Sequence, residues 1–255
     1  MLFYTDHGKG DVVILLHGYL ETSEVWESFA ARLSRSCRVI AVDLPGHGKS
    51  ALNAGTGTME SMAAEIKELI DSLGLSKVFM TGHSLGGYIT LAFAEQFPEM
   101  LSGYCLFHSH PLENTSENIE KREREIALVK AGKKDLMYPD NISRLFANEN
   151  IERFSAELER SRKIASGIPG EAIVAVLNGM ILRPSRVHVM ESGKIPCLWI
   201  LGAKDNYIDC RLVQAKVKLP VNAKLVILEK SGHIGFVEEE EKSLEVLTGF
   251  IEKCT

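Results

Sequence analysis

The sequence predicts an α/β fold in which a mostly parallel, twisted sheet is covered by helices on both faces. Over residues 1–110 and 194–255, short β-branched runs alternate with amphipathic helical segments, as is typical of parallel sheets. Between them, residues 111–193 keep only helical patterns. With 255 residues the chain is long enough for one buried core and an inserted lobe. We therefore expect a two-part core, 1–110 and 194–255, with a helical cap inserted at 111–193.

The first part of the chain supplies most of the expected sheet. Residues 12–16 form an apolar run typical of a fully buried strand, and residues 2–6 fit an antiparallel edge strand. Further strands are expected at 38–42, 77–81 and 102–107, with helices at 22–34, 59–73 and 85–96. Gly74 follows the second of these helices as a stop signal.

The rest of the chain begins with the inserted helices and then returns to alternation. Helices are expected at 116–131, 142–147, 151–166 and 170–182, then strands at 196–201 and 224–229 with helices at 209–217 and 238–253. The charged run 120–125 is interpreted as one solvated helix face, not as a binding motif.

Composition excludes several classes of function. A net charge of -5 does not indicate binding to nucleic acid or to anionic lipid. No apolar stretch is long enough for a membrane span. We expect that a signal peptide is absent from this N-terminus or has been removed. Five cysteines without CxxC spacing are expected to be free thiols, mostly buried, in a reducing cytoplasm; they are Cys37, Cys105, Cys197, Cys210 and Cys254.

The clearest chemical feature is a serine between two glycines at a strand–helix junction. Gly82, Ser84 and Gly86 form a G-x-S-x-G pattern directly after strand 77–81. A sharp turn there exposes the serine oxygen, and small neighbours let the backbone pass close. The N-terminus of the following helix directs N–H groups at the site. The pattern predicts Ser84 as a nucleophile.

A serine nucleophile needs a base, and the base needs an orienting acid. Asp205 follows the apolar strand 196–201, and His233 follows strand 224–229 in a Ser-Gly-His loop. Their order and positions at strand ends predict a Ser84–His233–Asp205 triad. Asp209 is the alternative acid, but it lies farther past the strand and is expected to cap the short helix.

The oxyanion donors are expected to be the backbone amides of Tyr19 and Leu85, one in the loop after strand 12–16 and one after the nucleophile. His17 is interpreted mainly as a turn residue of that loop. The residues expected around the substrate pocket are His17, Gly18, His83, His108, His110 and Ile234.

Two other patterns resemble binding motifs only superficially. The loop at 43–50 contains Gly-Lys-Ser, but Asp43 stands where a phosphate loop needs glycine, so we interpret it as structural. His108 and His110 alternate along a strand end, but no carboxylate or cysteine lies at ligand spacing. We expect no metal and no organic cofactor.

Taken together, these motifs resemble the α/β-hydrolase superfamily. His17-Gly18 is similar to its oxyanion loop, and residues 43–50 are similar to its D-x-P-G-x-G-x-S loop. Ser84, Asp205 and His233 match its nucleophile, acid and histidine. The resemblance covers about 1–110 and 194–255, and residues 111–193 occupy the family's cap position. It implies hydrolysis of an ester, thioester, amide or related bond.

The expected reaction is hydrolysis of a small ester-type molecule, a carboxylic ester, thioester or lactone, through an acyl-enzyme. Carbon–carbon bond hydrolases and perhydrolases keep the same triad and stay open, as does a hydrolase-fold receptor acting through a protein partner. Dehalogenases and epoxide hydrolases are similar in fold, but they use aspartate where this chain has Ser84. We expect a small-molecule substrate, no nucleic acid and no membrane, and the chain could be a monomer or a dimer.

Overall fold

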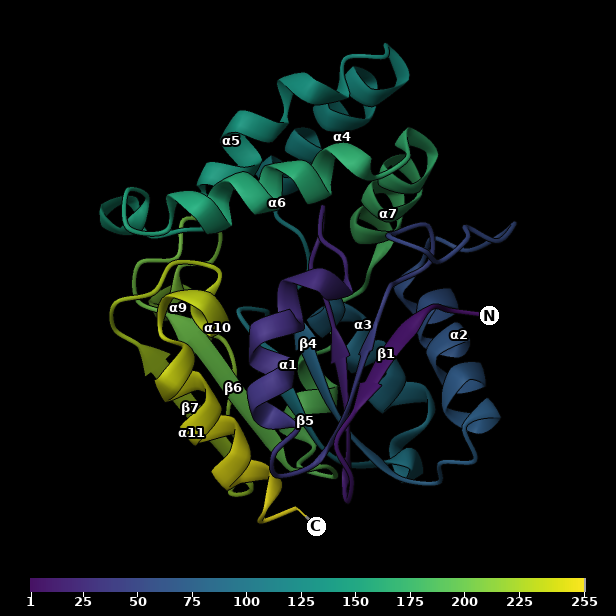
Figure 1. Cartoon of the computed structure of the whole chain (residues 1–255), viewed down its shortest axis with the longest axis vertical. Helices are drawn as coiled ribbons and strands as arrows, with labels where there is room; N and C mark the ends of the chain where they lie inside the picture. Colours follow the sequence, from purple (N-terminus) through teal and green to yellow (C-terminus); the bar gives the residue numbers. More distant parts are fainter. Residues whose placement is uncertain (255) are drawn as a thin grey trace.

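The computed structural model describes residues 1–254 and contains a seven-stranded sheet (Figure 1). The strands are β1 (Tyr4–His7), β2 (Val12–Leu16), β3 (Arg38–Val42), β4 (Val78–His83), β5 (Leu101–Phe107), β6 (Cys197–Gly202) and β7 (Ala223–Leu228). Their order is β1-β3-β2-β4-β5-β6-β7. Strand β1 is antiparallel to β3, and the other neighbouring pairs are parallel. The predicted α/β fold class, with its antiparallel edge strand, is confirmed.

Helices cover both faces of this sheet. On one face lie η1 (Ser23–Trp26), α1 (Glu27–Leu33), α10 (Gly235–Glu238) and α11 (Glu240–Ile251), with α1 packed against α11. On the other lie α2 (Met59–Ser72), α3 (Leu85–Gln96) and α8 (Val187–Glu191), with α3 contacting the other two. The short helices η2 (Pro98–Met100) and α9 (Cys210–Gln214) lead into β5 and follow β6.

Residues between β5 and β6 form a helical insertion over one end of the sheet. It comprises α4 (Ser116–Lys130), η3 (Lys134–Leu136), α5 (Tyr138–Ser143), η4 (Asn148–Asn150), α6 (Ser155–Gly167) and α7 (Gly170–Leu182), and α8 leads back to the core. In Figure 1, α4 to α7 lie together at the top of the molecule. Ser84, at the carboxyl end of β4, shares a cavity with α4 residues, so the insertion lies over that edge of the sheet.

The core explains why the strands are continuous apolar runs. Strands β4 and β6 are buried at every position because helices cover both of their faces. An aromatic cluster lies beside the carboxyl end of β5, where the Trp26 and Phe236 rings are 4.1 Å apart. Phe29 and Phe107 complete this cluster with edge contacts. It provides a rigid support for the loops that follow the strands.

The structure corrects several predicted helix boundaries. Helix α5 spans Tyr138–Ser143, not 142–147, because Pro139 fits the first turn of a helix, whose N–H groups have no helical acceptor. The carbonyl of Leu145, inside the predicted helix, instead accepts the His233 N–H at 2.7 Å. The C-terminal helix is interrupted at Glu239, and α8 was not predicted.

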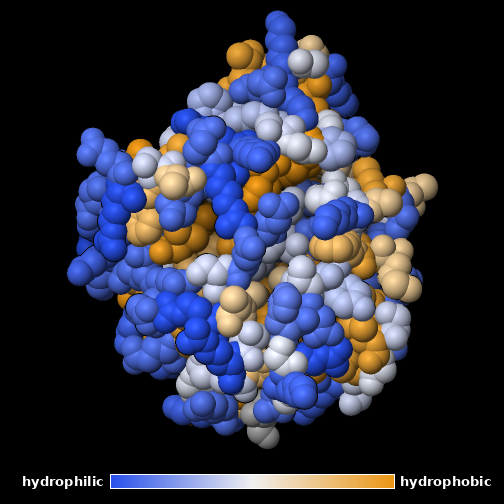
Figure 2. Space-filling view, viewed as in Figure 1, coloured by the Kyte–Doolittle hydropathy of each residue, from blue (hydrophilic) through white to orange (hydrophobic). Residues whose placement is uncertain are grey.

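The cysteines agree with the expectation that they are free and mostly buried. Figure 2 shows a mostly hydrophilic face, with hydrophobic side chains visible below α6, where the insertion meets the core. All five cysteines are free, and all but the half-buried Cys254 are buried. No single helix within residues 1–254 is long and apolar enough to cross a membrane; α6 and α7 pass that test only as a pair bent by 99°.

Candidate active site

Ser84 occupies a strained turn between β4 and α3. Its φ of 48° and ψ of -108° lie in a region that residues with a side chain rarely adopt. A Cβ on Gly82 would lie 2.2 Å from the Gly86 carbonyl oxygen, and one on Gly86 would lie 2.5 Å from the Leu16 carbonyl oxygen. Ser109 Oγ donates to the Ser84 carbonyl at 2.8 Å. The two glycines are therefore needed for the turn that presents the serine.

Asp205 and His233 form a buried pair beside this turn. Asp205 Oδ2 lies 2.7 Å from His233 Nδ1, and Oδ1 accepts the Tyr207 and Ile208 amides at 2.7 and 3.0 Å. Burial is the largest single influence and raises the pKa of Asp205, but the charges and hydrogen bonds of His233 and His108 together outweigh it and hold the pKa well below its usual range. The ionised carboxylate favours the Nδ1–H tautomer of His233, which leaves the Nε2 lone pair free.

His108 contacts the same carboxylate. Its Nε2 accepts the Gly235 N–H at 3.0 Å, so the neutral ring carries its proton on Nδ1, 3.5 Å from Asp205 Oδ2. Burial lowers the pKa of His108 to about 4. His108, Asp205 and His233 bring ligand-type atoms within 4.8 Å of one another. However, His108 has no free lone pair for a metal, and His233 Nδ1 is paired with the carboxylate.

A second buried acid–histidine pair lies beside Ser84. His83 Nδ1 is 2.9 Å from Glu21 Oε2, and Nε2 is 2.8 Å from the His233 carbonyl oxygen. Both neighbours are acceptors, so this geometry favours a ring that carries protons on both nitrogens, an imidazolium. Burial is the largest single influence and lowers the pKa of His83, but the charge and hydrogen bond of Glu21, with the His233 carbonyl and the Asp205 charge, together outweigh it and raise the pKa. The sequence analysis missed Glu21, because it lies 62 residues from His83.

This pair also holds the loop expected to bind the oxyanion. Glu21 Oε2 accepts the Gly18 N–H at 2.6 Å, and a Cβ on Gly18 would lie 2.7 Å from His83 Nδ1. Within the described chain, the backbone N–H groups of Tyr19 and Leu85 have no hydrogen-bond acceptor. Both amides are therefore available to a ligand, as the oxyanion assignment requires.

The cavity over Ser84 has a volume of about 110 Å³. His83, His110 and His233 line it together with Tyr19, Tyr88 and Tyr207 from the surrounding loops and α3. Four residues expected at the pocket do not line it: His17, Gly18, His108 and Ile234. The rings of His17 and His108 are fully buried, and each accepts a backbone N–H, from Leu44 and Gly235. Their role is to hold loops behind the cavity wall.

Helix α4 contradicts the interpretation of the run 120–125 as a solvated face. Asn118, Lys121, Arg122 and Glu125 all line the cavity, and Glu125 is buried. Their spacing of i, i+3, i+4 and i+7 places them on one side of the helix. That spacing was the signal available in the sequence, but an abundance of charge on every side concealed it.

Two other residues behave as the sequence suggested. The Asp209 carboxylate caps α9 by accepting the Arg211 and Leu212 amides at 2.9 and 3.1 Å. The Asp43 carboxylate accepts the Ser23 and Lys49 amides, both at 2.8 Å, and so organises the 43–50 loop internally. Both carboxylates therefore hold backbone amide groups in place.

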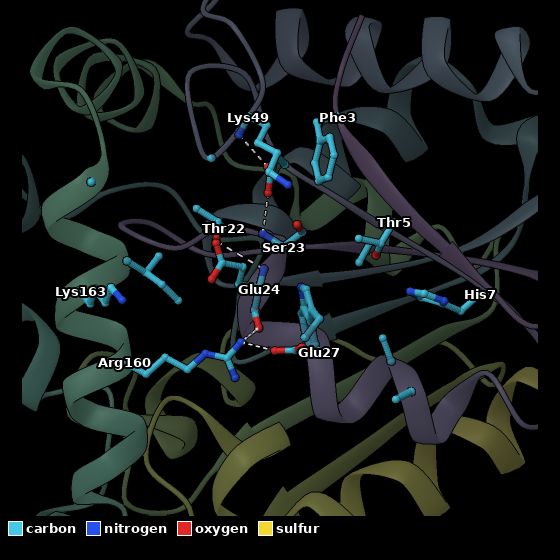
Figure 3. A pocket seen from close by; sticks show the side chains of 18 of the residues that line it. Phe3, Thr5, His7, Thr22, Ser23, Glu24, Glu27, Lys49, Arg160 and Lys163 are labelled. Carbon is cyan, nitrogen blue, oxygen red and sulfur yellow. Dashed lines mark hydrogen bonds and ion pairs between the residues drawn. The ribbon is translucent and has the colours of Figure 1, made fainter.

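A larger hollow of about 1000 Å³ lies elsewhere, between α6 and the core (Figure 3). Arg160 of α6 reaches across it to the Glu27 carboxylate and to the Glu24 carbonyl oxygen. Neither Ser84 nor His233 lines this hollow. The smaller cavity is therefore the candidate active site.

Comparison with known proteins agrees with this geometry. The family model for the alpha/beta hydrolase fold matches residues 11–240. An esterase of Thermogutta terrifontis, solved with malate bound, superposes with a TM-score of 0.94 at 27% identity, covering 99% of this chain and 93% of that one. Two curated relatives cover the chain similarly. A putative 2-succinyl-6-hydroxy-2,4-cyclohexadiene-1-carboxylate synthase of Bacillus subtilis is 27% identical, over 94% of this chain and 90% of its own length. A pimeloyl-[acyl-carrier protein] methyl ester esterase of Sodalis glossinidius is 25% identical, over 98% of this chain and 97% of its own length.

The matched region runs from β2 to the start of α11 and so includes Ser84, Asp205 and His233. The chain belongs to the alpha/beta hydrolase fold family and is an enzyme of the hydrolase type.

Proposed function

We propose that the protein is a serine hydrolase that cleaves a small carboxylic ester or related acyl substrate through an acyl-enzyme. One observation carries the proposal: Ser84 occupies a strained turn in a cavity that it shares with His233, whose Nδ1 is paired with Asp205. The likeness to esterases supports the choice of an ester-type bond.

The proposed reaction uses these groups in turn. Ser84 Oγ attacks the carbonyl carbon while His233 Nε2 takes its proton, and Asp205 stabilises the resulting imidazolium. The Tyr19 and Leu85 amides stabilise the negative charge on the carbonyl oxygen. Collapse of the intermediate expels the alcohol, which takes its proton from His233. Water, activated by His233, then attacks the acyl-serine and releases the acid.

The test is turnover of p-nitrophenyl acetate and p-nitrophenyl butanoate. Replacing Ser84 with alanine removes the nucleophile, and we expect kcat to fall by about 10³-fold or more. Ser72→Ala is the matched control, because Ser72 ends α2 and lies outside the cavity lining. If Ser84→Ala retained most of the wild-type rate, the assignment would be wrong.

A further inference from the structure

One end of the catalytic cavity carries positive charge that no acidic side chain neutralises. Arg122 of α4 lines the cavity, and Arg183, just after α7, stacks over the ring of Tyr88, which also lines it. Within residues 1–254, neither guanidinium forms an ion pair with a carboxylate. Buried or half-buried arginines without an acid are unusual, because an unpaired charge is costly to remove from water.

Arg122 is held in place by neutral partners. Its guanidinium donates to Asn114 Oδ1, while the Asn114 amide nitrogen donates to the Met180 and Ile181 carbonyl oxygens at 2.7 and 3.1 Å. Asn114 therefore has a fixed orientation and links α4 to α7. The arrangement positions the guanidinium without neutralising it, which leaves its charge available to a ligand.

Arg183 adds a second charge behind Tyr88. Its guanidinium carbon lies 3.8 Å from the centre of the Tyr88 ring, and it donates to the Leu112 carbonyl oxygen. The side chain is buried, and Nε has no hydrogen-bond partner. Burial, together with the charges of Arg183 and Arg122, lowers the pKa of the adjacent His110 to about 3. Both guanidiniums therefore act on the same part of the cavity.

Tyr88 offers a neutral donor at this end. His110 Nδ1 accepts the Leu112 N–H at 3.2 Å, so the neutral ring carries its proton on Nε2, 3.3 Å from the Tyr88 oxygen. The tyrosine oxygen accepts that proton, and its own O–H is free to donate into the cavity.

The neighbouring charges of the cavity are balanced, in contrast. Lys121 Nζ lies 3.9 Å from both the Glu125 and Asp140 carboxylates and donates to Asn141 at 3.0 Å. Glu125 also accepts from Asn141 at 2.9 Å and from the Tyr19 hydroxyl at 3.3 Å. The excess positive charge thus belongs to the Arg122–Tyr88–Arg183 end.

We propose that the substrate carries a carboxylate as well as the bond to be cleaved, and that Arg122 binds this carboxylate. The inference rests on the proposed ester hydrolysis. Arginine is suited to a carboxylate because its planar fork can donate two parallel hydrogen bonds. The cavity of about 110 Å³ accommodates only a short molecule. The substrate class is therefore a half-ester of a short dicarboxylic acid.

The test compares monomethyl glutarate with its half-amide, methyl 5-amino-5-oxopentanoate, which has the same number of heavy atoms and no charge. For the wild-type enzyme we expect kcat/KM to be at least about tenfold higher for the half-ester, as one charge-assisted hydrogen bond would give. Arg122→Gln should reduce this ratio at least about tenfold, mainly by raising KM for the half-ester. Using the ratio cancels any general loss of activity.

Arg124→Gln is the matched control, because Arg124 lies on the same helix, is 68% exposed and pairs with Glu120. We expect it to leave the ratio unchanged. A wild-type ratio near one, or an equal loss in both variants, would overturn the proposal. Ser84-dependent turnover of p-nitrophenyl acetate in that case would leave the ester hydrolase standing.

A binding measurement separates recognition from turnover. Calorimetry of glutarate with Ser84→Ala should detect binding that Arg122→Gln, on the same background, weakens at least about tenfold. Absence of glutarate binding to Ser84→Ala would contradict the carboxylate site, whatever the rate on neutral esters.

Discussion

At the scale of single residues, the Glu21–His83 pair connects the three loops that carry the proposed chemistry. Glu21 accepts the Gly18 N–H of the loop proposed to bind the oxyanion, and His83 immediately precedes Ser84, the proposed nucleophile. The opposite nitrogen of His83 donates to the backbone of His233. A shift of one loop would therefore break a hydrogen bond to another. Precise mutual placement of this kind strongly affects reaction rates.

Replacing Glu21 with glutamine tests the charge on His83. Because the carboxylate raises the pKa of His83, the wild-type ring should keep protons on both nitrogens above pH 6.5, the usual histidine value. In Glu21→Gln the burial of the ring is opposed only by the smaller influences of the His233 carbonyl and the Asp205 charge, so we expect a neutral ring at pH 7.5 and kcat about tenfold lower. Nitrogen-15 NMR of the histidine rings measures the protonation directly.

The control for this variant is Glu24→Gln, three residues along and exposed. It should leave the His83 signals unchanged. A neutral His83 in the wild-type protein at pH 6.5, or the same titration in Glu21→Gln, would contradict the imidazolium assignment.

At the scale of elements, Glu238 of α10 joins the helical insertion to the loop of His233. Its Oε1 accepts from the Ala147 N–H at 2.8 Å and from the Asn150 amide at 2.7 Å, and Oε2 accepts the Gly232 N–H at 2.6 Å. The side chain is 6% exposed. Arg160 also joins the insertion to the core, but it and Glu27 are 46% and 73% exposed. The two connections should therefore differ greatly in energy.

Truncating each connection measures that difference. Glu238→Ala leaves two buried N–H groups without an acceptor, and we expect the free energy of unfolding to fall by about 2–4 kcal/mol. Arg160→Ala removes an exposed ion pair and should cost about 1 kcal/mol or less. Urea denaturation of the wild-type protein and both variants gives these values. Equal losses would mean that burial does not set the strength of the two connections.

At the scale of the whole molecule, the carboxyl edge of the sheet is held by buried, uncharged histidines. Burial lowers the pKa of His47 and His110 to about 3 and that of His108 to about 4, and it also lowers the pKa of His17. In the unfolded chain these rings titrate near 6.5. Below that pH the unfolded state binds protons that the folded state does not, so stability must fall as the pH decreases.

His47 tests this dependence without touching the cavity. Each ring that stays neutral costs about 1.4 kcal/mol per pH unit between pH 6.5 and its folded pKa. We therefore expect the free energy of unfolding of His47→Asn to decline less steeply between pH 6 and 4 than that of the wild-type protein. The difference in slope should correspond to about one bound proton. Denaturant titrations across this range measure the slope, with the exposed His188→Asn as control. Parallel profiles for His47→Asn and the wild-type protein would show that His47 does not contribute.

The local sequence pattern was sufficient to predict the sheet and the proposed triad. It was not sufficient to predict the residues that form the walls of the cavity. Buried parallel strands are apolar runs, and Ser84 lies between obligatory glycines, so both are visible in a single stretch of chain. Glu21 and Glu238 are invisible in this way, because each is defined by partners far along the chain. Arg122 appeared to belong to a solvated helix, since its role depends on the insertion lying over the sheet.

The most direct test of the account is to identify which residue a serine-directed covalent probe modifies. After treatment with a fluorophosphonate, which phosphonylates activated serines, peptide mass mapping should place the adduct on Ser84, and Ser84→Ala should remain unlabelled. His233→Ala should be labelled at least about a hundredfold more slowly, because the base is lost. Labelling of a different serine, or equal labelling of wild-type protein and Ser84→Ala, would contradict the claim that Ser84 is the nucleophile.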